Sequence, residues 1–256
     1  MHDAAPAPLS PPPEPASGAI SLFLDFDGTL VEIAERPDAI VVDDRLRDLV
    51  RRLAERLDGR LAVVSGRTAG EIVAFLHAAD CQPPFAIAGS HGLELRWTDG
   101  RSESPARPEA LGAVLDGFAA LARSHPGVVV EEKPFGAALH YRGAPDAGPE
   151  CDALAQAMAQ AHGLSLQRGK MVCEVRLPGA DKGDAVRRFM ADRAMAGTTP
   201  IFLGDDVTDE AGFVAAAALG GWGVQVGATP ITAAHYRLAD VTAVHRWLGR
   251  IAGESA

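Results

Sequence analysis

Cysteine, positive charge and long apolar runs are all scarce in this sequence. Its 256 residues include only three cysteines, and their positions lack the spacing of a disulfide framework or a zinc site. Lysine and arginine number 24 against 34 acidic residues, which gives a net charge of −10 and makes binding to nucleic acid a poor expectation. A small anionic substrate is compatible with this charge, because it needs only a local positive pocket or a metal ion.

We also expect neither a targeting segment nor a membrane segment. The first residues contain no basic stretch followed by an apolar one, so we expect no signal peptide. Residues 211–234 carry no charge, but their glycines and small alanines are typical of a buried helix, a turn and a strand rather than of a membrane span. These absences predict a cytoplasmic protein that binds neither nucleic acid nor membrane, and they identify no protein partner.

Composition and element order divide the chain. Residues 1–19 are rich in proline and alanine and predict a disordered tail. From residue 20, short apolar runs alternate with amphipathic stretches, which is typical of a parallel sheet with helices on both faces. The expected strands are 20–25, 61–64, 85–88, 200–203 and 224–226, and the expected helices are 43–57, 68–76, 184–194, one ending near 218, and 241–251.

The element order changes between residues 101 and 178. The expected elements there are helices at 108–124 and 147–162, each followed by a strand pair, at 128–133 with 137–142 and at 164–167 with 171–177. We therefore predict an α/β protein. Its core, residues 20–100 and 179–256, is a doubly wound, Rossmann-like parallel sheet, and residues 101–178 form an inserted small α/β cap domain.

The strongest chemical signal is Asp25-Phe-Asp27-Gly28-Thr directly after an expected buried strand. Ligands bind at the carboxyl ends of strands in such sheets, and two acids placed there need solvent, hydrogen bonds or a cation. Asp25 is suited to act as a nucleophile, and Asp27 to protonate a leaving oxygen and then to activate water. An ordinary turn with surface aspartates is the alternative interpretation.

A second acidic cluster, Gly204-Asp205-Asp206-Val-Thr-Asp209-Glu, also follows a buried strand. Hard carboxylate oxygens at a strand end suit Mg²⁺, which usually takes one or two carboxylates and keeps water and substrate phosphate for its other positions. Helix capping explains one or two of these acids, but not the whole cluster beside the first acid pair.

Two further segments offer groups for an anion. Ser65-Gly66-Arg67 follows an expected strand and begins a helix, where a hydroxyl and backbone N–H groups form an anion site. Lys182 opens another helix and can hold both a carboxylate and a phosphate oxygen by its charge. The alternative interpretations are an ordinary strand-to-helix turn for residues 65–67 and a surface lysine for Lys182. Together the four segments are suited to phosphoryl transfer to an aspartate.

In these motifs the chain resembles the haloacid dehalogenase-like superfamily of phosphatases. The segments 63–67, 89–92, 131–133, 140–142, 174–176 and 204–210 more closely resemble the trehalose-6-phosphate phosphatase family. The resemblance implies a hydrolase of trehalose biosynthesis that uses Mg²⁺ and an aspartyl-phosphate intermediate. It implies catalytic roles for Asp25, Asp27 and Lys182. It also implies a magnesium site formed by Asp25, Asp27 through its carbonyl, Asp205 and Asp206, with Asp209 as the alternative to Asp206. It also implies substrate contacts by Ser65, Gly66, Arg67, His91, Gly92, Glu131, Lys133, Arg142 and Glu174.

Charged donors and acceptors on a cap sheet, here Glu131, Lys133, Arg142 and Glu174, can bind many sugar hydroxyls at once. The alternative interpretation of these four residues is a solvated sheet face with salt bridges. Two other functions stay open. One is a related sugar-phosphate phosphatase, of the sucrose-phosphate phosphatase or phosphomannomutase-like kind. The other is a non-catalytic sugar-phosphate-binding module, which would be expected to lack Asp25, Asp27 or Lys182.

Overall fold

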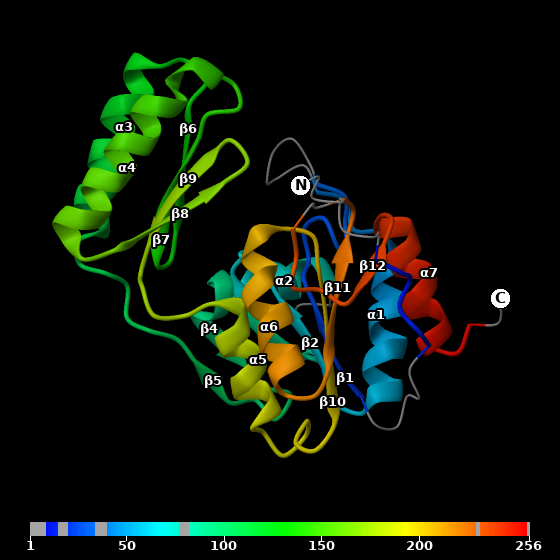
Figure 1. Cartoon of the computed structure of the whole chain (residues 1–256). Helices are drawn as coiled ribbons and strands as arrows, with labels where there is room; N and C mark the ends of the chain where they lie inside the picture. The colour runs from blue at the N-terminus through cyan, green and yellow to red at the C-terminus, as the bar shows by residue number, and fades with distance from the viewer. Residues whose placement is uncertain (1–8, 15–19, 34–39, 77–81, 229–230, 255–256) are drawn as a thin grey trace, which may run out of the picture. The chain divides into compact units, whose positions relative to one another are not determined.

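The computed structural model describes residues 9–14, 20–33, 40–76, 82–228 and 231–254 (Figure 1). The chain divides into two compact units, one of residues 1–103 and 180–256 and the other of residues 104–179. They are called here the core unit and the small unit. The predicted domain boundaries, at 100/101 and 178/179, lie close to this division.

The sheet of the core unit has the order β12-β11-β10-β1-β2-β3-β4-β5 in the described residues. Its strands are β1 (Ile20–Leu24), β2 (Leu61–Val64), β3 (Ala86–Gly89), β4 (Glu94–Arg96), β5 (Ser102–Glu103), β10 (Thr199–Gly204), β11 (Trp222–Val226) and β12 (Tyr236–Leu238). The strands from β12 to β3 in this order are parallel, and β4 and β5 add an antiparallel edge.

Apolar side chains on both faces of the central strands explain why helices cover the sheet on both sides. Leu22 and Leu24 pack into one hydrophobic cluster, with α1 (Asp44–Leu57), α2 (Ala69–Leu76) and α7 (Val241–Ile251). Phe23 points the other way, into a cluster with α5 (Lys182–Met190) and α6 (Glu210–Ala218). Figure 1 shows α1 and α7 on the side of the sheet opposite α5 and α6. The predicted fold class, a doubly wound α/β core, is confirmed.

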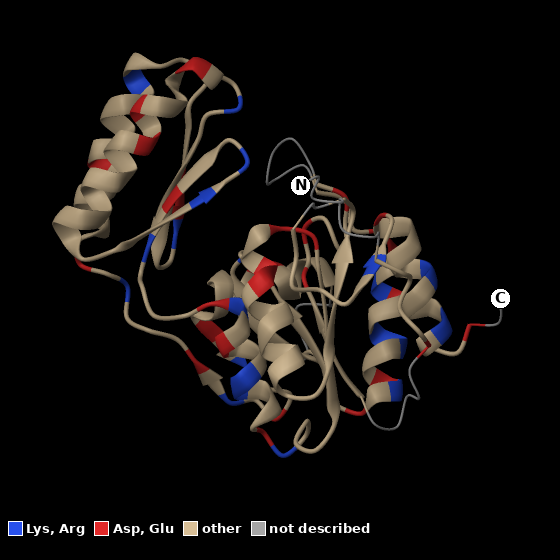
Figure 2. Cartoon of the chain, in the orientation of Figure 1, with Lys and Arg blue, Asp and Glu red and all other residues tan. Residues whose placement is uncertain are grey.

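The small unit has its own antiparallel sheet in the order β6-β7-β9-β8. The strands are β6 (Val129–Lys133), β7 (Gly136–His140), β8 (Ser165–Gly169) and β9 (Val172–Arg176), and the helices are α3 (Leu111–Ser124) and α4 (Gly148–His162). Alternate strand residues, among them Leu139 and Val175, pack against Phe118 and Ala155 of the two helices. Charged residues also lie on these strands, whereas the central strands β1, β2, β3, β10 and β11 of the core sheet carry none (Figure 2).

The ends of several elements differ from the predicted ones. The short strands β4, β5 and β12 and the 3₁₀ helices η3 (Ser90–Gly92), η4 (Pro145–Ala147) and η5 (Val207–Asp209) were not expected. The strand predicted at 137–142 ends at His140, because a turn closes between Tyr141 and Ala144 before Pro145. The helix predicted to reach residue 194 ends at Met190, and the Asp192 side chain accepts a hydrogen bond from the Ala194 amide in the following turn.

Part of the predicted disordered tail is placed on the core unit. The Ser10 carbonyl accepts a hydrogen bond from the Arg237 amide of β12, and the Pro13 carbonyl accepts one from the Trp247 indole of α7. Disorder is therefore the wrong prediction for residues 9–14, because their carbonyls bind donors of the core; the rest of the tail lies outside the described residues. None of the described helices combines the length and the apolar character of a membrane span.

Candidate active site

The candidate site of the core unit lies where β1 and β10 end. Asp25 follows β1 directly, and its amide donates to the Leu203 carbonyl of β10 over 2.9 Å. The two strands run parallel, with Leu24 opposite Leu203, so the segments that follow them leave the same edge of the sheet. Sheet register therefore brings the two acidic loops of the sequence together.

Lys182 is the centre of the buried charge network. Its Nζ donates to Asp25 Oδ1 over 2.7 Å and to Asp209 Oδ1 over 2.6 Å, and all three side chains are buried. Lys182 is the first residue of α5, whose start is fixed by a capping box between Asp181 and Asp184. The cap therefore sets the position of the ammonium group that joins the two carboxylates.

The loop after β10 is folded around Asp209. Its Oδ2 accepts hydrogen bonds from the amides of Asp205 and Asp206, over 3.0 and 2.9 Å. Gln225 of β11 donates to the Asp205 carbonyl over 2.9 Å. Gly28, with φ +84°, lies beneath the Asp205 carboxylate, and a Cβ built on it would come within 2.2 Å of Asp205 Oδ2. Glycine at this position lets the two loops approach.

Burial makes the charged forms of these acids costly. Burial raises the pKa of Asp25 well above its ordinary value. The charge of Lys182 lowers this pKa, and the charges of Asp209 and Asp205 raise it further. Burial likewise raises the pKa of Asp209, and it raises that of Asp205 to about 7 with a further contribution from Asp209. Burial lowers the pKa of Lys182, but Asp209 and Asp25 outweigh it and the net shift is upward.

The donor set fits a divalent magnesium ion. Asp25, Asp205 and Asp209 each offer a carboxylate oxygen, and these oxygens lie within 4.8 Å of one another. When all three carboxylates are ionised, Lys182 balances one of their negative charges and leaves two. Among the described residues, the buried Asp205 Oδ1 accepts no hydrogen bond. Hard oxygen ligands with an excess of two negative charges are what Mg²⁺ takes in proteins.

The Ser65–Arg67 segment follows β2 and contacts the η3 corner, Ser90–Gly92, which follows β3. The Ser65 hydroxyl accepts a hydrogen bond from the Arg67 amide over 3.1 Å. The carbonyls of Ser65 and Arg67 accept from the amides of His91 and Ser90, over 2.9 and 2.7 Å. A Cβ on Gly66 would come within 2.5 Å of the His91 ring. This contact holds the segment that is predicted to bind phosphate.

The corner itself has an unusual backbone. Ser90, His91 and Gly92 have φ values of +49°, +57° and +99°, a left-handed conformation that ordinary side chains disfavour. A Cβ on Gly92 would come within 2.6 Å of the Asp181 carbonyl, just before Lys182. The corner therefore packs against both the Ser65 segment and the start of α5. Backbone strain of this kind is common at functional sites.

Arg67 contacts the second aspartate of the first motif rather than an open pocket. Its Nε and Nη2 donate to Asp27 Oδ2 and Oδ1 over 2.7 and 2.8 Å. Asp206, by contrast, is exposed, and its side chain accepts from the Val207 amide. Of the two acids offered to support a metal, the structure groups Asp209 with Asp25 and Asp205.

The residues predicted to bind sugar lie on the small unit. Register places Glu131, Ala138 and Glu174 in one row across its sheet, on the face opposite the two helices. On this open face Lys133 Nζ donates to Glu174 Oε2 over 2.5 Å, and His140 Nε2 lies 2.7 Å from Glu131 Oε2. Three of the four predicted side chains therefore share one sheet face.

Arg142 lies apart from this group. It is exposed in the turn after β7, and within the described ranges it makes no hydrogen bond or ion pair. Arg176 of β9 instead shares the row of Lys133 on the open face, and its Nε donates to Gln167 over 3.1 Å. Sequence reasoning missed Arg176, although it lies two positions from Glu174 and strand alternation could have found it.

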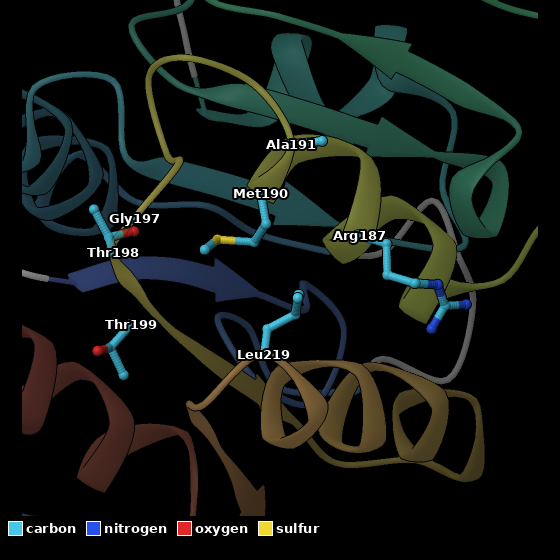
Figure 3. Close-up of a pocket in the computed structure, with 7 residues that line it drawn as sticks. All are labelled: Arg187, Met190, Ala191, Gly197, Thr198, Thr199 and Leu219. Atoms are coloured by element: carbon cyan, nitrogen blue, oxygen red, sulfur yellow. The ribbon is translucent and has the colours of Figure 1, made fainter.

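Gln225 was also missed as a site residue. The signal for it is a single amide inside an otherwise apolar strand, since a buried polar side chain needs hydrogen-bond partners. A shallow pocket of about 480 Å³ elsewhere in the core unit contains no predicted site residue (Figure 3). It includes Thr199 at the start of β10, whereas Asp205 follows the end of that strand, so the pocket is separate from the acidic site.

Comparison with known proteins agrees with these findings. Residues 23–242 match the sequence model of the family described as Trehalose-phosphatase. The chain is 39% identical over 246 residues to the trehalose-6-phosphate phosphatase of Escherichia coli K12, covering 95% of this chain and 90% of that protein. A trehalose-6-phosphate phosphatase related protein of known structure has a TM-score of 0.75 and 27% identity, with 92% and 97% of the two chains covered.

A more distant structure has a similar fold. The haloacid dehalogenase-like hydrolase from Bacteroides thetaiotaomicron is 16% identical to this chain, with a TM-score of 0.65 and coverage of 91% of this chain and 99% of that one. At this identity the likeness concerns the fold alone.

Proposed function

This chain belongs to the trehalose-phosphatase family and is a phosphoric monoester hydrolase, and we propose that its substrate is trehalose 6-phosphate, which it hydrolyses to trehalose and phosphate. The choice of trehalose 6-phosphate rests on the family match, and the observation that carries the phosphatase chemistry is the buried Lys182 ammonium between Asp25 and Asp209, with the Asp205 carboxylate beside them. A nucleophilic carboxylate held against a cation suits attack on an anionic phosphate.

The proposed reaction has two displacements at phosphorus. Asp25 Oδ attacks phosphorus, the bond to the sugar 6-oxygen breaks, and Asp27 gives that oxygen its proton. Asp27 then takes a proton from the water that hydrolyses the aspartyl-phosphate, so the enzyme returns to its starting state. Lys182 and Ser65 bind oxygens of the phosphoryl group throughout, and Asp209 holds Lys182 in place.

The residues that would hold Mg²⁺ are Asp25, Asp205 and the backbone carbonyl of Asp27. Both carboxylate oxygens of Asp209 already accept hydrogen bonds, so we assign it a supporting role. A bound Mg²⁺ ion supplies positive charge that offsets the repulsion between an anionic nucleophile and an anionic phosphate.

The open face of the small unit supports the choice of a sugar phosphate. It presents Glu131, Lys133, Glu174 and Arg176, a mixture of charged donors and acceptors suited to several hydroxyl groups. We assign the sugar contacts to these residues. The two described thiols, Cys151 and Cys173, are free, which supports a reducing compartment, and we propose the cytoplasm. The family match supports a place in trehalose biosynthesis.

Phosphate release from a panel of sugar phosphates, with Mg²⁺ and with a chelator, tests the proposal. We expect trehalose 6-phosphate to be preferred and release to depend on Mg²⁺. Asp25→Asn should reduce kcat by at least about 10³-fold, because it removes the nucleophile. Asp44→Asn, at an exposed position on α1, is the matched control and should leave kcat unchanged.

Three outcomes would contradict parts of the proposal. Strong preference for another sugar phosphate would reject the substrate, and release that is insensitive to chelation would reject the metal. Near-normal turnover by Asp25→Asn would reject the covalent intermediate.

A further inference from the structure

Arg67 was predicted to contact substrate, but its guanidinium is engaged inside the core unit. Its side chain is 10% exposed, and two of its nitrogens donate to the two oxygens of Asp27. A third, Nη1, lies 3.6 Å from Glu71 Oε1. The two parallel bonds to Asp27 form a bidentate pair, which fixes both the position and the rotation of a carboxylate.

Aromatic rings hold the guanidinium in this position. Its Cζ lies 5.7 Å from the ring centre of Phe26 and 5.2 Å from that of Phe75, and the two rings stack on each other at 5.5 Å. The backbone of Arg67 is fixed as well, because its amide donates to the Ser65 hydroxyl and its carbonyl accepts from the Ser90 amide. A side chain held at both ends in this way is preorganised.

Asp27 has few other restraints of this strength. Its side chain is 34% exposed, whereas Asp25 two residues earlier is buried and bonded to Lys182. A general acid and base must direct one oxygen at the reacting atom, and misorientation is costly. The only bidentate contact to Asp27 in the described part of the chain comes from Arg67.

We propose that Arg67 is a positioning residue for proton transfer, which orients Asp27 toward the leaving oxygen and the hydrolytic water, and is not a ligand of phosphate or sugar. This inference rests on the proposed role of Asp27. In the first displacement the proton moves from Asp27 to the departing oxygen as the P–O bond breaks. In the second, Asp27 recovers a proton from the attacking water, so no other reactant is needed.

The proposal predicts a dependence on the leaving group. A good leaving group departs without a proton, whereas a poor one needs the acid. The test compares Arg67→Lys with the unchanged enzyme on a series of aryl phosphates without sugar, ordered by the pKa of the released phenol. Lysine keeps the charge but cannot make the bidentate contact. Arg60→Lys, whose arginine contacts the Ile20 carbonyl, is the matched control.

We expect kcat/KM of Arg67→Lys to fall about 100-fold for the poorest leaving group and less than about fivefold for p-nitrophenyl phosphate. Inhibition by inorganic phosphate should keep its Ki. On p-nitrophenyl phosphate, Arg67→Lys should add no loss to Asp27→Asn, because the two residues act together. Phe75→Leu, which removes one ring contact and leaves the ion pair, should give a smaller loss with the same dependence on leaving group.

A uniform loss across the series, with a raised Ki for inorganic phosphate, would overturn the proposal in favour of phosphate binding. Unchanged rates across the series would also overturn it. If Asp27→Asn keeps full activity on the poorest leaving group, the proposed role of Asp27 fails, and this result is distinct from a failure of Arg67 alone. Melting temperatures of the variants separate both results from loss of fold.

Discussion

At the scale of single residues, the core unit places more negative charge in its interior than one lysine balances. Asp25 and Asp209 share Lys182, and Asp205 adds a third carboxylate with a buried oxygen that accepts no hydrogen bond in the described residues. Uncompensated buried charge reduces stability, so the site proposed for phosphoryl transfer should weaken the fold in the absence of a cation.

This imbalance gives a pH dependence of stability. Burial raises the pKa of Asp205 to about 7 in the folded chain, against 3.8 for an ordinary aspartate. The folded state therefore binds a proton that the unfolded state has lost, and the free energy of unfolding should fall as pH rises from about 4 to about 7. Thermal melts of chelator-treated protein at several pH values measure this slope.

Asp205→Asn should flatten the slope, and Mg²⁺ should stabilise the unchanged protein more at pH 7 than at pH 5. Asp44→Asn, which alters an exposed acid, should keep the original slope. A metal-free protein whose stability rises steadily over this pH range would contradict the expectation.

Sequence reasoning identified the residues at strand ends but not all of their partners. Asp25 and Asp205 were predictable, because parallel strands end at one edge of the sheet. The choice between Asp206 and Asp209 was not, since both lie within one turn and capping suits either acid. The pair of Arg67 with Asp27 joins residues 40 positions apart and depends on side-chain direction, which sequence pattern does not encode.

At the scale of elements, the η3 corner connects two segments that are predicted to bind phosphate. Its left-handed residues contact the Ser65 segment on one side, and Gly92 lies against the Asp181 carbonyl at the start of α5 on the other. A change in this corner should therefore move Ser65 and Lys182 together.

Gly92→Ala tests this coupling. Alanine in a left-handed conformation costs about 1–2 kcal/mol, and a methyl 2.6 Å from a carbonyl adds about 1–3 kcal/mol of overpacking. Gly220→Ala is the control, because Gly220 also has positive φ, +83°, but nothing lies within 4 Å of its Cβ position. Urea unfolding measures the stability of each variant.

Gly92→Ala should also raise the Ki of inorganic phosphate, whereas Gly220→Ala should not. Equal loss of stability in the two variants, with unchanged phosphate inhibition, would show that the corner does not position the phosphate ligands.

Helix α1 was predictable because its apolar periodicity is strong, and β1 because it is a continuous apolar run. The strands β4, β5 and β12 have only two or three residues, too few for a period-two pattern, and exist because a neighbouring strand offers hydrogen bonds. The end of β7 at His140 likewise depends on a turn, and it separates Arg142 from the open face.

At the scale of the whole molecule, each unit has a hydrophobic core of its own. The change of element order in the sequence indicated a separate unit at residues 101–178, and the compact units of the structure divide at 103/104 and 179/180. The sequence did not predict that residues 9–14 lie along β12 and α7, because proline-rich composition predicts disorder and the partners of the Ser10 and Pro13 carbonyls are more than 220 positions away.

The contact between Pro13 and Trp247 predicts a role for this segment in stability. Trp247→Phe removes the indole donor and part of a buried ring, so it should cost about 1 kcal/mol for the hydrogen bond in addition to the cost of the lost packing. In a chain that begins at residue 15 the same substitution should cost about 1 kcal/mol less, because the indole has already lost the Pro13 acceptor. Urea unfolding of the four proteins measures the difference. Equal costs in the two chain lengths would contradict the contact.

Cys151 and Cys173 are both buried among the helices and sheet of the small unit. Burial raises the pKa of each thiol, that of Cys173 to about 11, so at neutral pH neither is present as the reactive thiolate while the unit is closed. Alkylation at these sites thus requires local unfolding. With Cys81 replaced by serine, the rate of thiol labelling reports the opening of the small unit. In the same sample, turnover of p-nitrophenyl phosphate, which has no sugar, reports the core unit.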